Sequence, residues 1–212
     1  MKNNKLENRS YICEVRAVQT ENGHTITGRP IVYNSRTNIG PFDEIIDPGA
    51  LDGADLRDVR FLINHDTSRI PVARSRRNNG NSTMQLTPDV FGMDISADLD
   101  IENNSESRAL YSAVDRGDIS GMSFMFSVDD EEWEDLESDH PTRHIRKIGS
   151  VVEVSAVTFP AYESTEIYAR SKEALESARS ALENARQQSA ETVDTALELA
   201  KEKTKLLVGG LN

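Results

Sequence analysis

Cysteine is almost absent from this chain, and its scarcity limits what can hold the fold together. Cys13 is the single cysteine among 212 residues, so no disulfide can form within the chain and a reducing compartment is the expected setting. Histidine is scarce as well, with four residues, and no cluster of histidine and cysteine has the spacing of a structural zinc site. We therefore expect neither a disulfide framework nor a metal site.

Basic residues and long apolar runs are also in short supply. Lys and Arg number 24 against 36 Asp and Glu, which gives a formal net charge of -12, whereas a phosphate-binding surface needs an excess of cations. No run approaches the roughly 18 apolar residues of a membrane span. The polar N-terminal segment MKNNKLENRS lacks the apolar stretch of a signal peptide. These absences predict a soluble intracellular protein that binds neither nucleic acid nor membrane.

Most of the chain has the alternating pattern of β-strands. Residues 11–20 and 25–34 alternate and are joined through Asn22-Gly23, a strong hairpin signal, and Gly28 and Pro30 predict a bulge in the second strand. Further strands are predicted within residues 42–51, 58–66, 82–99, 121–128 and 150–159. One helix is predicted after residue 104, with Ser105 or Ser107 as its cap and Gly117 as its end. The acidic run from Asp129 to Asp139 is predicted to be a solvated loop.

The composition divides the chain into three parts. Residues 1–10 are polar and predicted to be disordered, residues 11–170 form a mainly β domain, and residues 171–212 form a helical extension rich in Ala, Glu, Lys and Leu. Leu175, Ala178, Leu182 and Ala185 fit a heptad seam. The tail is therefore either a coiled coil or partner-binding helix, or a solvated single helix.

Three polar residues lie among the apolar residues of predicted strands, where each would be costly to bury. Ser123 lies between Met122 and Phe124, Glu153 shares its face with valines, and His65 continues an apolar row. A serine, a histidine and a carboxylate are the components of nucleophilic acyl transfer, in which imidazole takes the serine proton and the carboxylate orients the imidazole. Each residue alone also has an ordinary structural explanation, so spacing leaves both interpretations open.

Five segments add a resemblance. GRPIVYNS, FDEIIDPGAL, DVRFLINHD, RGDISGMSFMFSV and VVEVSAVTFPAYESTEI, in this order, resemble the HK97-type prohead maturation serine proteases of tailed phages, over residues 11–168. That family is related to the herpesvirus assembly proteases, so the resemblance implies an α+β fold: a closed, herpesvirus-protease-like β-barrel with flanking helices. It places the family histidine on His65, the nucleophile on Ser123 and the acidic member on Glu153.

Several assignments have rivals. His144 is the alternative third member, because the herpesvirus enzymes use a second histidine, and Ser120 is the alternative nucleophile. No oxyanion donor stands out, and Arg170 is only a remote candidate. A basic cluster follows His65 and either receives an acidic substrate segment or balances the negative surface; it consists of Arg69, Arg74, Arg76 and Arg77.

The resemblance also implies a function. It indicates a serine endopeptidase of the Ser-His-Glu type that needs no cofactor and acts in the host cytoplasm inside the assembling prohead. Its expected substrates are the scaffold, the N-terminal scaffolding segment of the major capsid protein and the enzyme itself. Homodimerisation, or self-association through the tail, is a further expectation. The alternative is a non-catalytic capsid scaffold or assembly module that uses the helical tail, and an unrelated hydrolase on another β fold is a third.

Overall fold

Two β-sheets and two helices make up the part of the chain that the computed structural model describes, which is residues 6–13, 15–21, 23–77, 79–159 and 171–187. The smaller sheet has the strand order β2-β3-β9-β8. Its strands are β2 (Val15–Thr20), β3 (Gly23–Val32), β8 (Met84–Asp89) and β9 (Gly92–Leu99). The predicted hairpin between β2 and β3 is confirmed, and so is the irregularity in β3, where the register with β9 shifts between Gly28 and Ile31.

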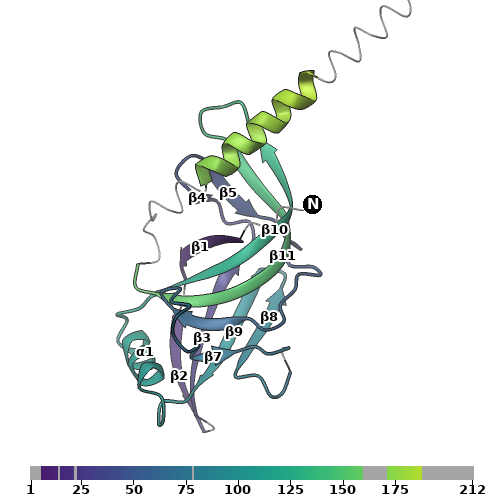
Figure 1. Cartoon of the computed structure of the whole chain (residues 1–212). Helices are drawn as coiled ribbons and strands as arrows, with labels where there is room; N and C mark the ends of the chain where they lie inside the picture. The colour runs from purple at the N-terminus through teal and green to yellow at the C-terminus, as the bar shows by residue number, and fades with distance from the viewer. Residues whose placement is uncertain (1–5, 14, 22, 78, 160–170, 188–212) are drawn as a thin grey trace, which may run out of the picture.

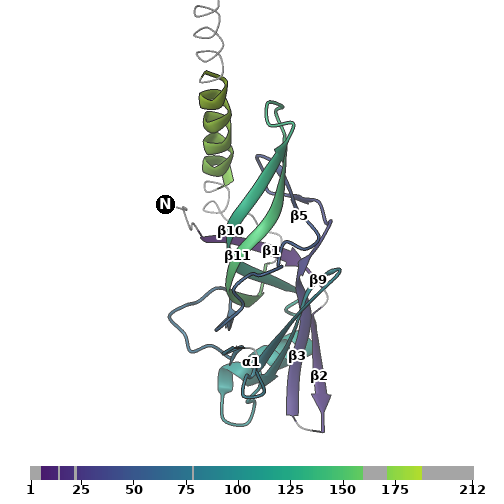
Figure 2. The same cartoon turned by 90° about the vertical axis from the view of Figure 1, so that its right-hand side faces the viewer.

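The larger sheet is built around one long hairpin, β10 (Gly121–Glu134) and β11 (Thr142–Val157). β1 (Leu6–Ile12) pairs with β10 on one side, and β11 carries the other strands on its far side. These are β4 (Thr37–Asn38), β5 (Asp43–Ile46), β6 (Arg60–Ile63) and β7 (Ala73–Arg74). In Figures 1 and 2 the hairpin runs from the smaller sheet to the far end of the molecule. We call that far end the arm; it consists of the last part of β10, the turn at residues 135–141 and the first part of β11.

The prediction of a mainly β fold with helices is confirmed, but the closed barrel is not. Among the described residues neither sheet closes on itself. β5 pairs in parallel with the first part of β11 and β6 with the last part, so the sheet branches at β11 instead of continuing round a cylinder. In a closed barrel each strand pairs with one strand on either side, so that the last strand pairs with the first.

The core lies between the two sheets and uses the alternation of β10. Met122, Phe124 and Phe126 are fully buried there, together with Ile26 and Met93 of the smaller sheet. Because successive side chains of a strand point to opposite faces, this packing turns the odd-numbered residues of β10 away from the core. Ser123 is one of them, so burial of its neighbours fixes the side on which its hydroxyl lies.

Two sequence predictions are wrong in detail. The helix α1 (Ser105–Asp115) is capped by Asn104, whose side chain accepts hydrogen bonds from the amides of Glu106 and Ser107, so neither predicted serine is the cap. The acidic run is not a loop from its start, because β10 continues to Glu134. Its carboxylates pair across the hairpin with basic residues of β11, as in the ion pair of Glu132 with Arg146.

The second helix, residues 171–187, packs along the arm (Figure 2). Leu175 is buried with Ile39 and Phe42, and Trp133 packs against this small cluster. Arg179 donates hydrogen bonds to main-chain carbonyls of the arm's turn. Residues 171–187 of the predicted tail are thus helical, while residues 188–212 lie outside the described residues and the coiled coil stays a prediction.

A buried ion network joins β1 to the hairpin. The Arg9 guanidinium donates to both oxygens of Glu44 at 2.5 and 2.7 Å, and Arg143 donates to Glu44 and Glu7 at 3.1 and 2.7 Å. Arg143 also pairs with Glu131. Burial alone would raise the pKa of Glu7, but the hydrogen bonds and charges of Arg143 and Arg9 outweigh it and lower that pKa to about 2. β1 begins at Leu6, inside the segment predicted to be disordered, and this network helps to hold it there.

Candidate active site

His65 lies on a tight turn directly after β6. The amide of Asp66 donates to the carbonyl of Ile63 at 3.1 Å, and the two residues between them, Asn64 and His65, have φ values of 51° and 59°. Two successive left-handed residues are typical of a type I′ turn. This conformation is uncommon for non-glycine residues, although Asn and His adopt it more often than most of them. The turn therefore holds His65 in a conformation that its neighbours must stabilise.

Hydrogen bonds from the end of β11 stabilise this turn. The Asn64 amide donates to the carbonyl of Ala156 at 2.9 Å, and the Asn64 side chain exchanges hydrogen bonds with Thr158, whose amide donates to Asn64 Oδ1 at 2.9 Å. The His65 amide donates to Ser155 Oγ at 3.1 Å. These bonds offset the cost of the left-handed backbone, which is about 1–3 kcal/mol per residue, and fix where the imidazole starts.

The imidazole of His65 contacts the carboxylate of Glu153. Nδ1 lies 2.5 Å from Glu153 Oε1, and an ionised carboxylate can only accept, so Nδ1 is the donor when the ring is neutral. The Glu153 side chain is 2% exposed and that of His65 24%. Among the described residues Nε2 has no hydrogen-bond partner. The pair thus has the geometry of an oriented base, with the basic nitrogen left for another group.

Ser123 lies one strand away from this pair. In the register of β10 and β11 it is directly opposite Ser155, and Met125 is opposite Glu153. Opposed residues of antiparallel strands share a face, so Ser123 and Glu153 are on the same side of the sheet. β6 lies on the other side of β11, which puts the β10 and β6 backbones about 10 Å apart. The His65 side chain extends over β11 toward β10, which brings its imidazole to Glu153.

The Ser123 hydroxyl is engaged elsewhere in this arrangement. Oγ donates to the main-chain carbonyl of Arg9 in β1 at 2.8 Å, and the residue is fully buried. Within the described part of the chain no hydrogen bond joins Ser123 to His65. The structure therefore brings His65 and Glu153 into contact and Ser123 onto the adjacent strand, without direct contact between serine and base.

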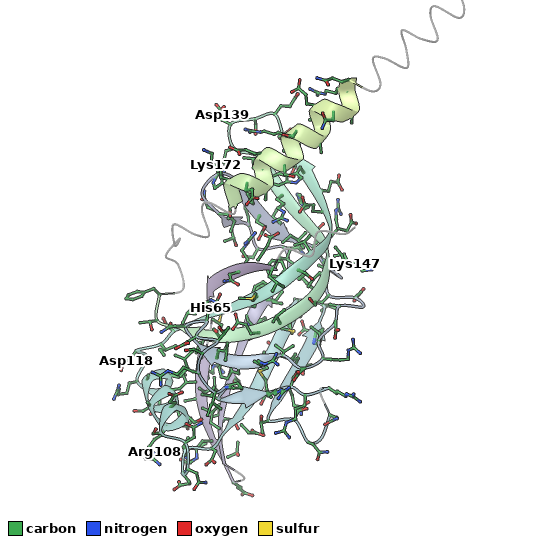
Figure 3. All side chains as sticks on the ribbon, in the orientation of Figure 1. His65, Arg108, Asp118, Asp139, Lys147 and Lys172 are labelled. Carbon is green, nitrogen blue, oxygen red and sulfur yellow. The ribbon has the colours of Figure 1, made fainter. Side chains whose placement is uncertain are left out.

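The rival residues lie in other surroundings. His144 is at the opposite end of β11 from Glu153, with Nδ1 2.9 Å from Asp47 Oδ1. Ser120 is exposed and precedes the first residue of β10. Figure 3 shows His65 at the end of the hairpin away from Asp139, which is on the arm. The contact partner of His65 is thus Glu153, and Arg170 lies outside the described residues.

Two members of the basic cluster after His65 form ion pairs. Arg69 pairs with Glu106 of α1 at 2.6 Å, and Arg74 pairs with Asp58. Arg76 and Arg77 are exposed. At least half of the cluster thus balances local carboxylates, which agrees with the structural interpretation of these arginines.

Ser155, Asn64 and Thr158 contact the site and were not singled out from the sequence. Ser155 shares a strand face with Glu153, so the alternation of β11 predicts their proximity, but a serine on a strand carries no functional signal of its own. Asn64 and Thr158 meet only through the parallel pairing of β6 with β11, which a single sequence does not reveal.

Neither a metal-binding cluster nor a membrane-spanning helix is present among the described residues. They contain no group of three or more His, Cys, Asp or Glu side chains that could hold a metal ion. No helix in the same ranges is long and apolar enough to cross a membrane.

Comparison with known proteins identifies the family. No curated protein and no solved structure matches the chain. The family model described as caudovirus prohead serine protease matches residues 12–179. The matched range contains the turn with His65, the strand with Ser123 and the strand with Glu153, as well as the first part of the docked helix. The chain therefore belongs to the caudovirus prohead serine proteases, the serine peptidases of phage capsid maturation.

Proposed function

We propose that this chain is a serine endopeptidase in which Ser123 is the nucleophile, His65 the general base and then general acid, and Glu153 the residue that orients His65. The observation that carries the proposal is the 2.5 Å contact between His65 Nδ1 and Glu153 Oε1, one strand away from a serine on the same face of the sheet. A buried carboxylate that fixes one imidazole nitrogen leaves the other free to take a serine proton.

The proposed reaction requires one rearrangement. When a substrate binds, Ser123 Oγ exchanges its hydrogen bond to the Arg9 carbonyl for one to His65 Nε2. His65 then takes the proton while Oγ attacks the peptide carbonyl carbon, and the protonated imidazole, stabilised by Glu153, gives that proton to the leaving amine. Water attacks the acyl-enzyme with His65 again as base, which releases the second product and restores Ser123.

The family supports the choice of substrates and place. We assign to this enzyme the scaffold and the N-terminal scaffolding segment of the major capsid protein as substrates, together with its own chain, inside the assembling prohead in the host cytoplasm. Enclosure in the prohead would bring enzyme and capsid protein together at high effective concentration. The tail after residue 171 is the segment through which we expect self-association or delivery into the shell.

The test is co-expression of the full chain with its capsid precursor. Ser123→Ala should abolish cleavage, since loss of the nucleophile of a serine protease lowers kcat by about a millionfold, and should leave the melting temperature nearly unchanged. Ser120→Ala is the matched control and should process the precursor at the wild-type rate. A serine-directed fluorophosphonate should label the wild type but not Ser123→Ala. Full processing by Ser123→Ala would overturn the proposal.

A non-catalytic assembly module is the second candidate, and the complete burial of Ser123 favours it. Such a module would bind capsid protein or scaffold through the docked helix and the remainder of the tail. The two candidates differ when the chain is expressed alone. A protease should shorten its own chain in a way that Ser123→Ala prevents, whereas a module should stay at full length.

A further inference from the structure

One hydroxyl connects the two halves of the His65–Glu153 pair. Ser155 Oγ donates to Glu153 Oε2 at 2.5 Å and accepts the hydrogen bond of the His65 main-chain amide at 3.1 Å. Ser155 is fully buried. The hydroxyl thus touches the carboxylate that orients the imidazole and also the backbone from which the imidazole projects.

These contacts fix the direction of the hydroxyl proton. A serine hydroxyl has one proton and two lone pairs. The amide of His65 can only donate, so it occupies a lone pair, and the single proton is directed to Glu153 Oε2. The two Glu153 oxygens are consequently divided: Oε1 faces His65 Nδ1 and Oε2 faces Ser155. A rotation of the carboxylate would break both hydrogen bonds at once.

The backbone contact is equally specific. His65 has a φ of 59°, a left-handed conformation that is uncommon for a non-glycine residue and costs about 1–3 kcal/mol. Its amide lies over the end of β11, and within the described residues Ser155 Oγ is the acceptor that this amide finds. Without the hydroxyl, the partly buried His65 amide and one carboxylate oxygen of Glu153 would each lose a partner, and both belong to the residues that set the position of the imidazole.

We infer that Ser155 is a positioning residue for catalysis: its hydroxyl holds the Glu153 carboxylate and the His65 backbone in one arrangement, so that Nε2 is directed toward the nucleophile. This inference rests on the proposed function. Ser155 acts through His65 and Glu153 and not on the substrate. Its own proton is committed to a carboxylate, and its neighbour on His65 is the amide and not a basic ring nitrogen, so the same geometry gives it no base for attack.

Ser155→Thr and Ser155→Val form a matched pair for the test. Both add a methyl group at the same buried place, but only threonine keeps the hydroxyl. On a peptide taken from the capsid precursor, we expect the valine variant to have a kcat about 10- to 100-fold below that of the threonine variant, the effect of a misplacement of about 1 Å. KM should differ by less than about twofold, because Ser155 does not contact the substrate.

Ser155→Ala removes the hydroxyl without adding volume and covers the case in which the larger variants do not fold. It should lower kcat to about 10- to 100-fold below that of the wild type. The low-field NMR signal of the proton between His65 and Glu153 should broaden or shift. A purely structural role would lower the melting temperature while leaving kcat per folded molecule and this NMR signal as in the wild type. That result would refute the inference, as would equal kcat values for the threonine and valine variants.

Fluorophosphonate labelling separates failure of this inference from failure of the proposed function. If Ser123→Ala stays active, the proposed function fails whatever the Ser155 variants do. If Ser123 is essential and labelled but the Ser155 variants keep full kcat, only the positioning role fails. Label on Ser155, lost in Ser155→Ala, would make Ser155 the nucleophile and would overturn both.

Discussion

The buried ion network gives a quantitative prediction for Glu44→Gln. The Glu44 side chain is 0% exposed, and the two guanidinium groups that it accepts from, those of Arg9 and Arg143, are 4% and 3% exposed. Glutamine preserves the shape but removes the negative charge and replaces one acceptor oxygen with a donor amide. Both arginines then keep their charge with less compensation, and breaking a buried pair from one side costs about 3–5 kcal/mol.

This cost should be visible as a loss of global stability. For a chain of this size, 1 kcal/mol corresponds to about 2–4 °C in the melting temperature, so the expected decrease is about 6–20 °C. Urea unfolding can be followed through Trp133, the single tryptophan, whose ring lies 4.8 Å from that of Phe42 and near the Arg143 guanidinium.

Glu131→Gln is the matched control. Glu131 pairs with the same Arg143, but its side chain is 33% exposed, and exposed pairs contribute about 0–1 kcal/mol. The two substitutions are chemically identical, so burial is the variable that separates them. If Glu44→Gln and Glu131→Gln lost the same small amount of stability, the network would not hold β1 in the way described.

Three further predictions concern the tail, the pH dependence and the histidine turn. Leu175→Ala should undock the helix 171–187 from the arm and speed trypsin cleavage after Arg179, which in the wild type is bonded to the arm; an unchanged rate would contradict this docking. The pKa of Glu7 is lowered from 4.5 to about 2 in the folded chain, so its contribution to stability is complete above about pH 4.5 and is lost as the pH falls toward 2. Acid unfolding of Glu7→Gln should accordingly be less steep over that window. Asn64→Ala should lower stability by about 1–3 kcal/mol, because alanine in this left-handed conformation loses the three side-chain hydrogen bonds with Thr158, and it should reduce cleavage as well; wild-type values for both would refute the role of the turn.

The strands that build the core could be predicted from the sequence because their signal is local. The alternation of Met122, Phe124 and Phe126 is sufficient to place β10 and to turn Ser123 to the opposite face. The continuation of β10 through its acidic residues could not be predicted in this way. Those carboxylates are compensated across the hairpin by basic residues such as Arg146. A cross-strand ion pair does not alter the alternation of apolar and polar residues within either strand, so the sequence of one strand does not reveal it.

The candidate site, too, could be predicted from the sequence only in part. His65 and Glu153 are polar residues that interrupt apolar patterns in the sequence, and the structure brings them into contact. His65 was predicted on a strand face but lies on the turn after β6, because that strand ends at Ile63. Ser155 gives no such signal, since its importance lies in two hydrogen bonds that require the pairing of β6 with β11. The cap of α1 shows the same limit at short range, because Asn104, Ser105 and Ser107 are all good caps and only the backbone conformation selects Asn104.

The burial of Ser123 gives the proposed enzyme a form of latency. A hydroxyl without exposed surface, bonded to a main-chain carbonyl of β1, is out of reach of a peptide or a phosphonate until the segments over it separate. The observed rate of labelling should then be the intrinsic rate multiplied by the fraction of open molecules, as in amide hydrogen exchange. A protease with this property would be inactive when it is synthesised. Its activation would require a larger fraction of open molecules and no change in the catalytic residues.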